Sequence, residues 1–359
     1  MLIFFFVIIG LSVLILGHEA GHFVAAKFFR LKVDEFGFGF PPRIWAWKPN
    51  QEGRRENREE STVYSINALP FGGFVRIAGE SDRIADGAEK LEVLPEAERE
   101  RLFYFQPAWK RALVTGAGVA INFVLGWFLL TVILMIGLPQ ALIVSDVQPG
   151  SPAEAAGILS GDAIVGFKDS QSFVSFVNEN KGKATAFTLK RNGEEVILTA
   201  TPRAEVAPGE GALGVLFFEG GEEGRGFFAA IGEGFKRSLY VFSSVFVALF
   251  YLVNNLIFQG SLLAGVVGPV GVFAAAYDAG GLGFLYLAQI IAAISLNLAA
   301  VNLIPFPALD GGRLLLILVE KLKGSPISRK VEAYTNGVGF AFLIALMVML
   351  TVRDIGGLF

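Results

Sequence analysis

The only two histidines in the sequence lie four residues apart, in the run His18-Glu19-Ala20-Gly21-His22. On a helix, residues at this spacing stand one above the other, about 5–6 Å apart at Cβ. Both imidazoles can then bind one Zn²⁺ at about 2.0–2.1 Å each. Glu19 lies about 100° around the helix, where its carboxylate can reach a water on the metal. The pattern predicts a zinc site; two polar residues paired inside a helical bundle are the alternative.

A zinc ion with two histidines needs another protein ligand and an open position for water. The chain has no cysteine and no third histidine, so this ligand must be a carboxylate. Asp310 is the candidate, because it ends an uncharged run that begins at Gly283. Pro305 and Pro307 break a helix there, and the freed backbone groups need protein or water around them at membrane depth. The alternative is a helix that ends at the interface, with Asp310 in a turn before Gly311.

The composition indicates a membrane protein. Of the 359 residues, 53% are hydrophobic and 18% are charged, whereas soluble domains have about 45–50% and about 25%. This disfavours a soluble enzyme. The net charge of −3 offers no basic surface for nucleic acid, and the absence of cysteine excludes disulfides and thiolate sites. No basic region precedes the first apolar run, so we expect a retained span rather than a cleaved signal peptide.

Charge predicts the orientation of the spans, because basic residues favour the cytoplasmic side of a membrane. Segment 27–111 has fifteen Lys or Arg, whereas 139–235 has seven against thirteen Asp or Glu. We therefore expect 27–111 in the cytoplasm and 139–235 outside it. His18 and Asp310 then meet near the cytoplasmic leaflet only if an odd number of crossings separates them. Residues 238–259 are mostly apolar, but their polar side chains recur at helical spacing, so this segment should dip into the membrane or lie on it.

Further motifs give the chain a family resemblance. The runs Phe36–Pro41, Leu69–Val75 and Phe105–Arg111 accompany the histidine motif and the run Asn302–Gly312. Together they resemble the site-2 protease family of intramembrane zinc metalloproteases, and most closely the bacterial regulator-of-sigma-E protease type with a single PDZ domain. The resemblance covers nearly the whole chain. It departs from the family at Val119, where a proline is usual.

The resemblance also implies residue roles. It implies three zinc ligands and a catalytic base, which are His18, His22, Asp310 and Glu19. It implies that the side-chain amide of Asn302 helps to hold substrate within the membrane. It also implies that a membrane-associated β-loop, which includes Gly72 and Gly73, contacts substrate. From the residues alone, Asn302 could equally be a polar contact between helices. The β-loop is expected as a hairpin within 61–79, whose exposed strand edge could capture an unwound substrate.

Segment 139–220 alternates short β-rich runs with turns, including a hairpin turn at Asn192-Gly193. The run Val147–Ile158, followed by Gly161-Asp162, resembles the circularly permuted PDZ domain of bacterial membrane proteases. Such domains take peptides by adding a strand to a sheet edge. Obstruction of bulky substrates and a purely structural spacer are the alternatives.

We therefore predict a polytopic α-helical membrane protein with about four transmembrane helices, a membrane-associated β-loop region and one extracytoplasmic PDZ domain. The predicted spans are 1–26, 112–138, 283–312 and 334–353. The predicted segments between them are the cytoplasmic and β-loop region 27–111, the PDZ domain 139–220, an amphipathic membrane-associated segment 221–282 and a cytoplasmic link 313–333.

The predicted function is intramembrane proteolysis in the bacterial cytoplasmic (inner) membrane. By resemblance, the substrates are single-span membrane proteins already shortened outside, such as anti-sigma factors or signal-peptide remnants. The other expected partners are the lipid bilayer and a peptide ligand of the PDZ domain. A non-enzymatic PDZ adaptor is less favoured, because a structural zinc site usually has four protein ligands. An ion transporter is less favoured because it would need ionisable residues on several spans.

Overall fold

The computed structural model describes residues 2–49, 61–80, 95–167, 169–191, 194–206, 210–259 and 266–356. They form two compact units. The helical unit combines residues 8–127, 237–272 and 291–359, and the sheet unit combines residues 1–7, 128–236 and 273–290. The predicted turn at 192–193 lies outside the described residues.

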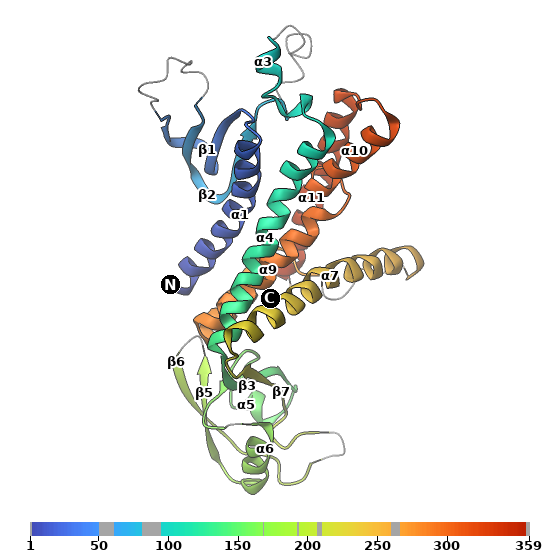
Figure 1. Ribbon diagram of the computed structural model, residues 1–359. Helices are drawn as coiled ribbons and strands as arrows, with labels where there is room; N and C mark the ends of the chain where they lie inside the picture. Colours follow the sequence, from blue (N-terminus) through green and yellow to red (C-terminus); the bar gives the residue numbers. More distant parts are fainter. Residues whose placement is uncertain are drawn as a thin grey trace. The chain divides into compact units, whose positions relative to one another are not determined.

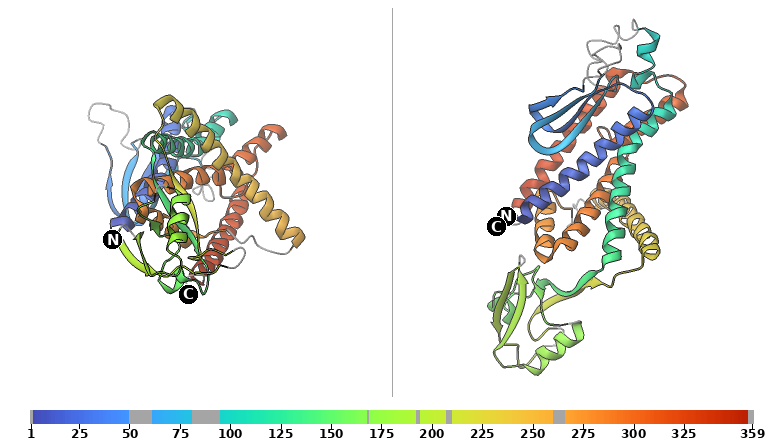
Figure 2. Two further views of the ribbon diagram at one scale, coloured as in Figure 1. Left: turned by 90° about the horizontal axis from the view of Figure 1, so that it is seen from below. Right: turned by 60° about the vertical axis from the view of Figure 1, so that its left-hand side comes forward.

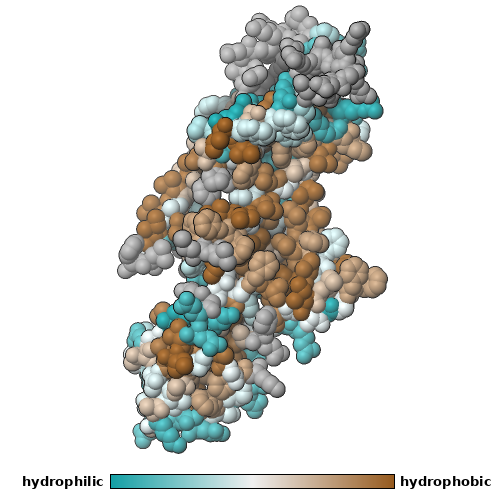
Figure 3. All heavy atoms as spheres, turned by 90° about the vertical axis from the view of Figure 1, so that its left-hand side faces the viewer, coloured by the Kyte–Doolittle hydropathy of each residue, from teal (hydrophilic) through white to brown (hydrophobic). Residues whose placement is uncertain are grey.

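Five helices in the described part of the chain are long and apolar enough to cross a membrane (Figure 1). They are α1 (Leu2–Phe28), α4 (Ala108–Ile136), α7 (Phe227–Gln259), α9 (Phe284–Leu303) and α11 (Arg329–Gly356). The 27 residues of α1 extend about 40 Å, more than the about 30 Å of a hydrocarbon core. On the face seen in Figure 3, apolar side chains cover much of the helical unit. The chain is thus built as a multi-pass membrane protein, and α7 is the helix that the four predicted spans do not include.

The segment predicted as the third span is interrupted. Helix α9 ends at Leu303, residues 304–309 are not helical, and α10 (Asp310–Lys323) begins at Asp310. Pro305 and Pro307 account for the break, because proline lacks an N–H and clashes with the preceding turn. The segment 313–333, predicted as a link, therefore contains most of a helix. In the amphipathic segment 221–282, a second helix, α8 (Pro269–Leu282), follows α7.

Three helices of the helical unit run side by side, as Figures 1 and 2 both show for α1, α4 and α9. Helices α1 and α4 meet backbone to backbone at Gly21, where a Cβ would lie 2.5 Å from the carbonyl oxygen of Ala117. Helices α4 and α9 are joined by the Ser295 hydroxyl, which donates to the Asn122 carbonyl oxygen at 2.8 Å. Small residues allow such close approach in membrane bundles.

The β-loop region consists of β1 (Val33–Trp47) and β2 (Val63–Ile77), which pair antiparallel. Residues 33–38 of β1 pair with 73–77 on one side and with 63–66 on the other. The prediction that 61–79 forms a hairpin with itself is therefore wrong, because β1 lies between its two halves. Residues 73–77 have no second partner strand in the described part of the chain, so they form a sheet edge.

Ion pairs connect α10 to the polar ends of its neighbours. The Arg111 guanidinium lies near the start of α4 and pairs with the Glu320 carboxylate at 2.6 Å. Arg313 pairs with Glu80, which follows β2. Two short helices, α3 (Glu96–Arg99) and η2 (Phe103–Phe105), complete this end of the unit.

The sheet unit contains a five-stranded antiparallel sheet in the order β6-β5-β4-β3-β7. Its strands are β3 (Leu138–Val147), β4 (Ala163–Ile164), β5 (Thr185–Arg191), β6 (Glu194–Ala200) and β7 (Val215–Glu222), with α5 (Pro152–Ala155) and α6 (Ser170–Glu179) between them. Strand β5 shows why the sheet forms, because Thr185, Phe187 and Leu189 are buried and alternate with less buried residues. Phe187 and Leu189 belong to a core that includes Leu142 and Phe173.

A buried ion pair supports the sheet. The Arg191 guanidinium donates to both carboxylate oxygens of Asp162 at 2.7 Å, and the Leu159 N–H donates to the same carboxylate at 2.9 Å. Only 2% of the Asp162 side chain is exposed, against 28% of the Arg191 side chain. This pairing raises the pKa of Arg191 above its usual value.

We expect Asp162→Asn to destabilise the sheet unit by about 2–4 kcal/mol, because it leaves a partly buried guanidinium without its counter-charge. Native-state hydrogen exchange of the β4 and β5 amides in the full chain measures this loss. Asp146→Asn is the control, because Asp146 is exposed on β3 and bonds only the N–H of its neighbour among the hydrogen bonds described. Equal exchange rates in both variants would contradict the prediction.

Candidate metal centre

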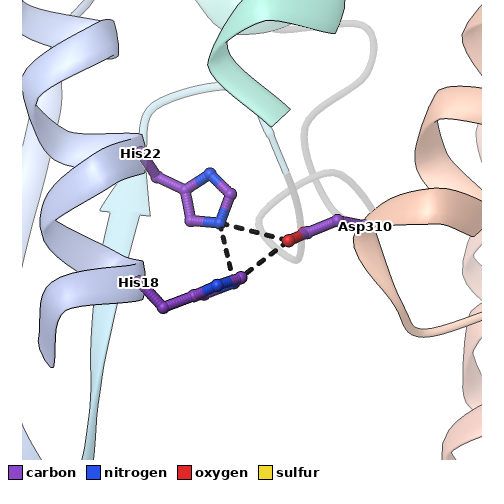
Figure 4. A group of neighbouring side chains, drawn as sticks. All are labelled: His18, His22 and Asp310. Carbon is purple, nitrogen blue, oxygen red and sulfur yellow. Dashed lines mark hydrogen bonds and ion pairs between the residues drawn. The ribbon is translucent and has the colours of Figure 1, made fainter. Parts of the chain in front are cut away.

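Three ligand atoms from two distant parts of the sequence converge in the helical unit (Figure 4). His18 Nε2 lies 3.0 Å and His22 Nε2 lies 3.4 Å from Asp310 Oδ2, and the two Nε2 atoms are 3.2 Å apart. The three side chains are only 11–13% exposed. The structure thus brings together the three residues predicted as zinc ligands.

These separations suit one zinc ion. Ligand atoms about 2.0–2.1 Å from a tetrahedral metal lie about 3.3–3.4 Å from one another. Asp310 Oδ2 is buried, and no hydrogen-bond donor satisfies it within the described ranges of the chain. Such an orphaned carboxylate oxygen, facing two ring nitrogens, is a costly arrangement unless a cation joins the three. The donor set of two imidazoles and a carboxylate is that of catalytic zinc sites.

The two histidines and the aspartate are positioned by different local features. His18 and His22 are adjacent on one face of α1 because they are four residues apart. Asp310 is the first residue of α10, where the helix dipole favours a carboxylate. The turn before it contains Ala308 in a left-handed conformation, with φ of 73°. The Ala308 N–H donates to Asn336 Oδ1 of α11 at 3.2 Å, so α11 supports this strained turn.

Helix α4 forms the wall behind the histidines. The Val114 carbonyl oxygen lies 2.9 Å from His22 Nδ1, which leaves His22 Nε2 free for a metal. One turn later, a Cβ on Gly118 would lie 2.5 Å from His22 Nε2 and 2.8 Å from a carbon of the His18 ring. The next turn carries Asn122, whose Nδ2 lies 3.4 Å from His18 Nδ1. Sequence reasoning gave these three residues no role, although a step of four on an apolar helix marks one face.

Glu19 and the ligands line one polar cavity of about 440 Å³. The Val75 N–H on the edge of β2 donates to Glu19 Oε2 at 3.0 Å, so the carboxylate is held against the strand. Asn302, at the end of α9, lines the same cavity, as do Glu80 and Arg313.

The two glycines predicted to contact substrate lie on β2 but do not line the cavity. Gly73 is beside the base, because a Cβ there would lie 3.8 Å from Glu19 Cγ. Gly72 has φ of 95°, which only glycine adopts readily. Their neighbours Phe74 and Val75 line the cavity instead.

The comparison with known families agrees with this geometry. Residues 6–346 match the sequence model of Peptidase family M50. This chain belongs to peptidase family M50. The predicted membership of the site-2 protease family is therefore confirmed, whereas the single-PDZ type stays a prediction.

Relatives of this M50 peptidase align along nearly their whole length. The chain is 28% identical to the zinc metalloprotease RasP of Geobacillus kaustophilus, over 99% of this chain and 97% of that protein. It is 31% identical to a putative zinc metalloprotease of Clostridium perfringens, over 98% and 97% of the two chains. It is 29% identical to the regulator of sigma-W protease RasP of Bacillus subtilis, over 98% of both.

We expect Gly118→Ala to reduce the zinc content of the purified protein strongly, because the added methyl overlaps both imidazoles. The matched control is Gly116→Ala on the same helix, where an added Cβ meets no atom within 4 Å in the described structure. Metal analysis of both variants under identical purification compares them. Wild-type zinc in Gly118→Ala would mean that α4 does not pack against the histidines in this way.

Proposed function

We propose that the protein is a zinc metalloprotease that hydrolyses peptide bonds in or near the transmembrane segments of single-span membrane proteins. The observation that carries the proposal is the convergence of His18, His22 and Asp310 on one cavity that Glu19 also lines. Three of the helices that line this cavity, α1, α4 and α9, are apolar enough to span a membrane. Membership of family M50 and the names of the relatives support the same chemistry.

When bound by His18, His22 and Asp310, Zn²⁺ supplies Lewis acidity and lowers the pKa of water toward about 7. Glu19 then acts as the base: it accepts a proton from the attacking water and passes it to the leaving amine. The Val75 N–H holds the Glu19 carboxylate within the cavity for this transfer. Among the described residues, only three protein ligands gather in the cluster, which favours a catalytic site over a closed structural one.

The edge of β2 is our candidate for the substrate site. A peptide bond inside a transmembrane helix is inaccessible until that helix unwinds, and an unwound strand needs partners for its backbone. Residues 73–77 offer an edge next to Glu19, so an extended segment paired there would pass the base. Asn302 lines the cavity and could hold the scissile region by its amide. Gly72 and Gly73 keep the edge free of side chains on the approach.

The orientation in the membrane follows from charge. We propose that the protein lies in the bacterial cytoplasmic membrane, with residues 139–220 outside and the metal centre near the cytoplasmic leaflet. Residues 237–259 of α7 run at a wide angle to α4 and α9 (Figures 1 and 2), which supports a helix that enters or lies on the membrane. One relative is named a regulator of sigma-W protease, and this supports membrane-anchored regulators such as anti-sigma factors as substrates.

The sheet unit is our candidate for a PDZ domain that takes a peptide. Strand β7 is an edge strand, and a cavity of about 250 Å³ lies between it and α6. Phe173, Val177 and Leu213 give this cavity an apolar lining. The Ser170 N–H donates to Glu219 at 2.7 Å, which fixes α6 to β7, and the hydrogen bonds of Ser170 lower the pKa of Glu219. Exclusion of bulky substrates is the alternative role of this domain.

We expect Glu19→Gln to lower the cleavage rate of a reconstituted single-span substrate by about 10²–10⁴-fold, because general acid–base catalysis is lost. Zinc content should be unchanged, since Glu19 is not among the clustered ligands. A zinc chelator should abolish the wild-type activity. The control is Glu98→Gln, which removes the same charge from an exposed position on α3.

Wild-type cleavage by Glu19→Gln would overturn the protease proposal. If neither protein cleaves while the full chain binds peptides through its sheet unit, the adaptor function is favoured instead.

A further inference from the structure

His18 can bind a metal through Nε2 only if its proton is on Nδ1. A neutral imidazole has one N–H and one lone pair, and the partner of one nitrogen decides where the proton lies. The Nε2 atoms of His18 and His22 both face Asp310 Oδ2. Both rings therefore need a hydrogen-bond acceptor at Nδ1. His22 has one, since its Nδ1 lies 2.9 Å from the Val114 carbonyl oxygen.

The group next to His18 Nδ1 is the side-chain amide of Asn122, 3.4 Å away. Asn122 is only 1% exposed, and its Oδ1 is buried with no hydrogen-bond partner among the described residues. The structure has Nδ2 toward the ring, which suits an unprotonated Nδ1. Rotation of the amide by 180° exchanges its two ends and turns the orphaned Oδ1 into an acceptor for Nδ1–H.

We propose that Asn122 is a positioning residue that sets the tautomer of His18: its Oδ1 accepts the Nδ1–H and leaves the Nε2 lone pair for zinc. This inference rests on the proposed zinc site and extends it to α4. The amide then does for His18 what the Val114 carbonyl does for His22. A buried acceptor behind a metal-binding histidine typically contributes 10–100-fold to metal affinity.

The surroundings of Asn122 fit a fixed acceptor. Its own carbonyl oxygen accepts the hydroxyl of Ser295 on α9 at 2.8 Å, and Ser295 is fully buried. One turn earlier, Gly118 lets α4 approach both imidazoles. Val114, Gly118 and Asn122 follow at steps of four residues, so one face of α4 holds both rings from behind.

The test compares zinc affinity in three full-length variants by competition with a chelator of known affinity. Asn122→Leu keeps similar volume but removes the acceptor, and we expect a 10–100-fold loss of affinity. Asn122→Asp keeps an acceptor and should stay close to wild type. Thr115→Val is the control for the same helix, because the Thr115 hydroxyl is buried without a partner in the described structure.

The chain has only two histidines, so ¹⁵N-histidine labelling gives a readout that does not depend on activity. In the zinc-loaded wild type we expect two hydrogen-bonded Nδ1–H signals. In Asn122→Leu, the His18 Nδ1–H should move to lower frequency and exchange faster with solvent, while the His22 signal stays. In Asn122→Asp, the His18 signal should remain hydrogen-bonded.

Wild-type zinc affinity and an unchanged His18 signal in Asn122→Leu would overturn the inference. So would an equal loss in Asn122→Asp and Asn122→Leu, which would indicate a packing role. Two different results would contradict the proposed zinc site itself: a wild-type protein that binds no zinc, or a His18→Ala variant that binds as much zinc as the wild type.

Discussion

Two ring nitrogens and one carboxylate oxygen lie within 3.4 Å of one another, and the rest of the structure depends on this constraint. One of them belongs to a carboxylate that is 13% exposed. Separated from water and from a cation, such a group is expensive to bury. The arrangement persists only if the surrounding helices hold each ligand in place independently. Helices α4, α10 and α11 lie where they can hold these ligands in place.

The ligands are held in place partly by local helix geometry and partly by contacts between residues far apart in the sequence. The histidine pair needs only helix geometry, because α1 itself sets the spacing. Asp310 needs more, because no helix turn connects it to α1. The strained turn at Ala308 bonds Asn336 of α11, and α10 is held to α4 through the pair of Arg111 and Glu320. The third ligand is thus positioned by contacts distributed over the unit.

This division explains which parts of the site could be predicted from the sequence. The histidines and Glu19 follow from a repeat that a helix converts directly into proximity, and Asp310 follows from the limited choice of ligands. Gly118 and Asn122 could not be assigned, because their contact with the imidazoles depends on the rotation of α4 against α1. The β-loop was predicted with the wrong partner for a similar reason: alternation specifies which face of a strand is buried, but not which strand lies beside it. In the same way, Pro305 and Pro307 predicted a break in the helix. That a new helix, α10, begins at Asp310 was not predicted and is seen only in the structure.

The contact between Glu19 and Val75 connects the proposed catalytic base to the strand edge that is proposed to bind substrate. The base does not stand free on α1, since its carboxylate accepts a hydrogen bond from the backbone of β2. Along an edge strand, alternate backbone N–H and C=O groups do not pair with the neighbouring strand, and the Val75 N–H is bonded to Glu19 instead. A single strand edge therefore orients the base and is also the proposed site for the substrate backbone. Any movement of residues 73–77 must displace the base and the proposed substrate edge together, which makes the β-loop an integral part of the metal centre rather than an accessory to it.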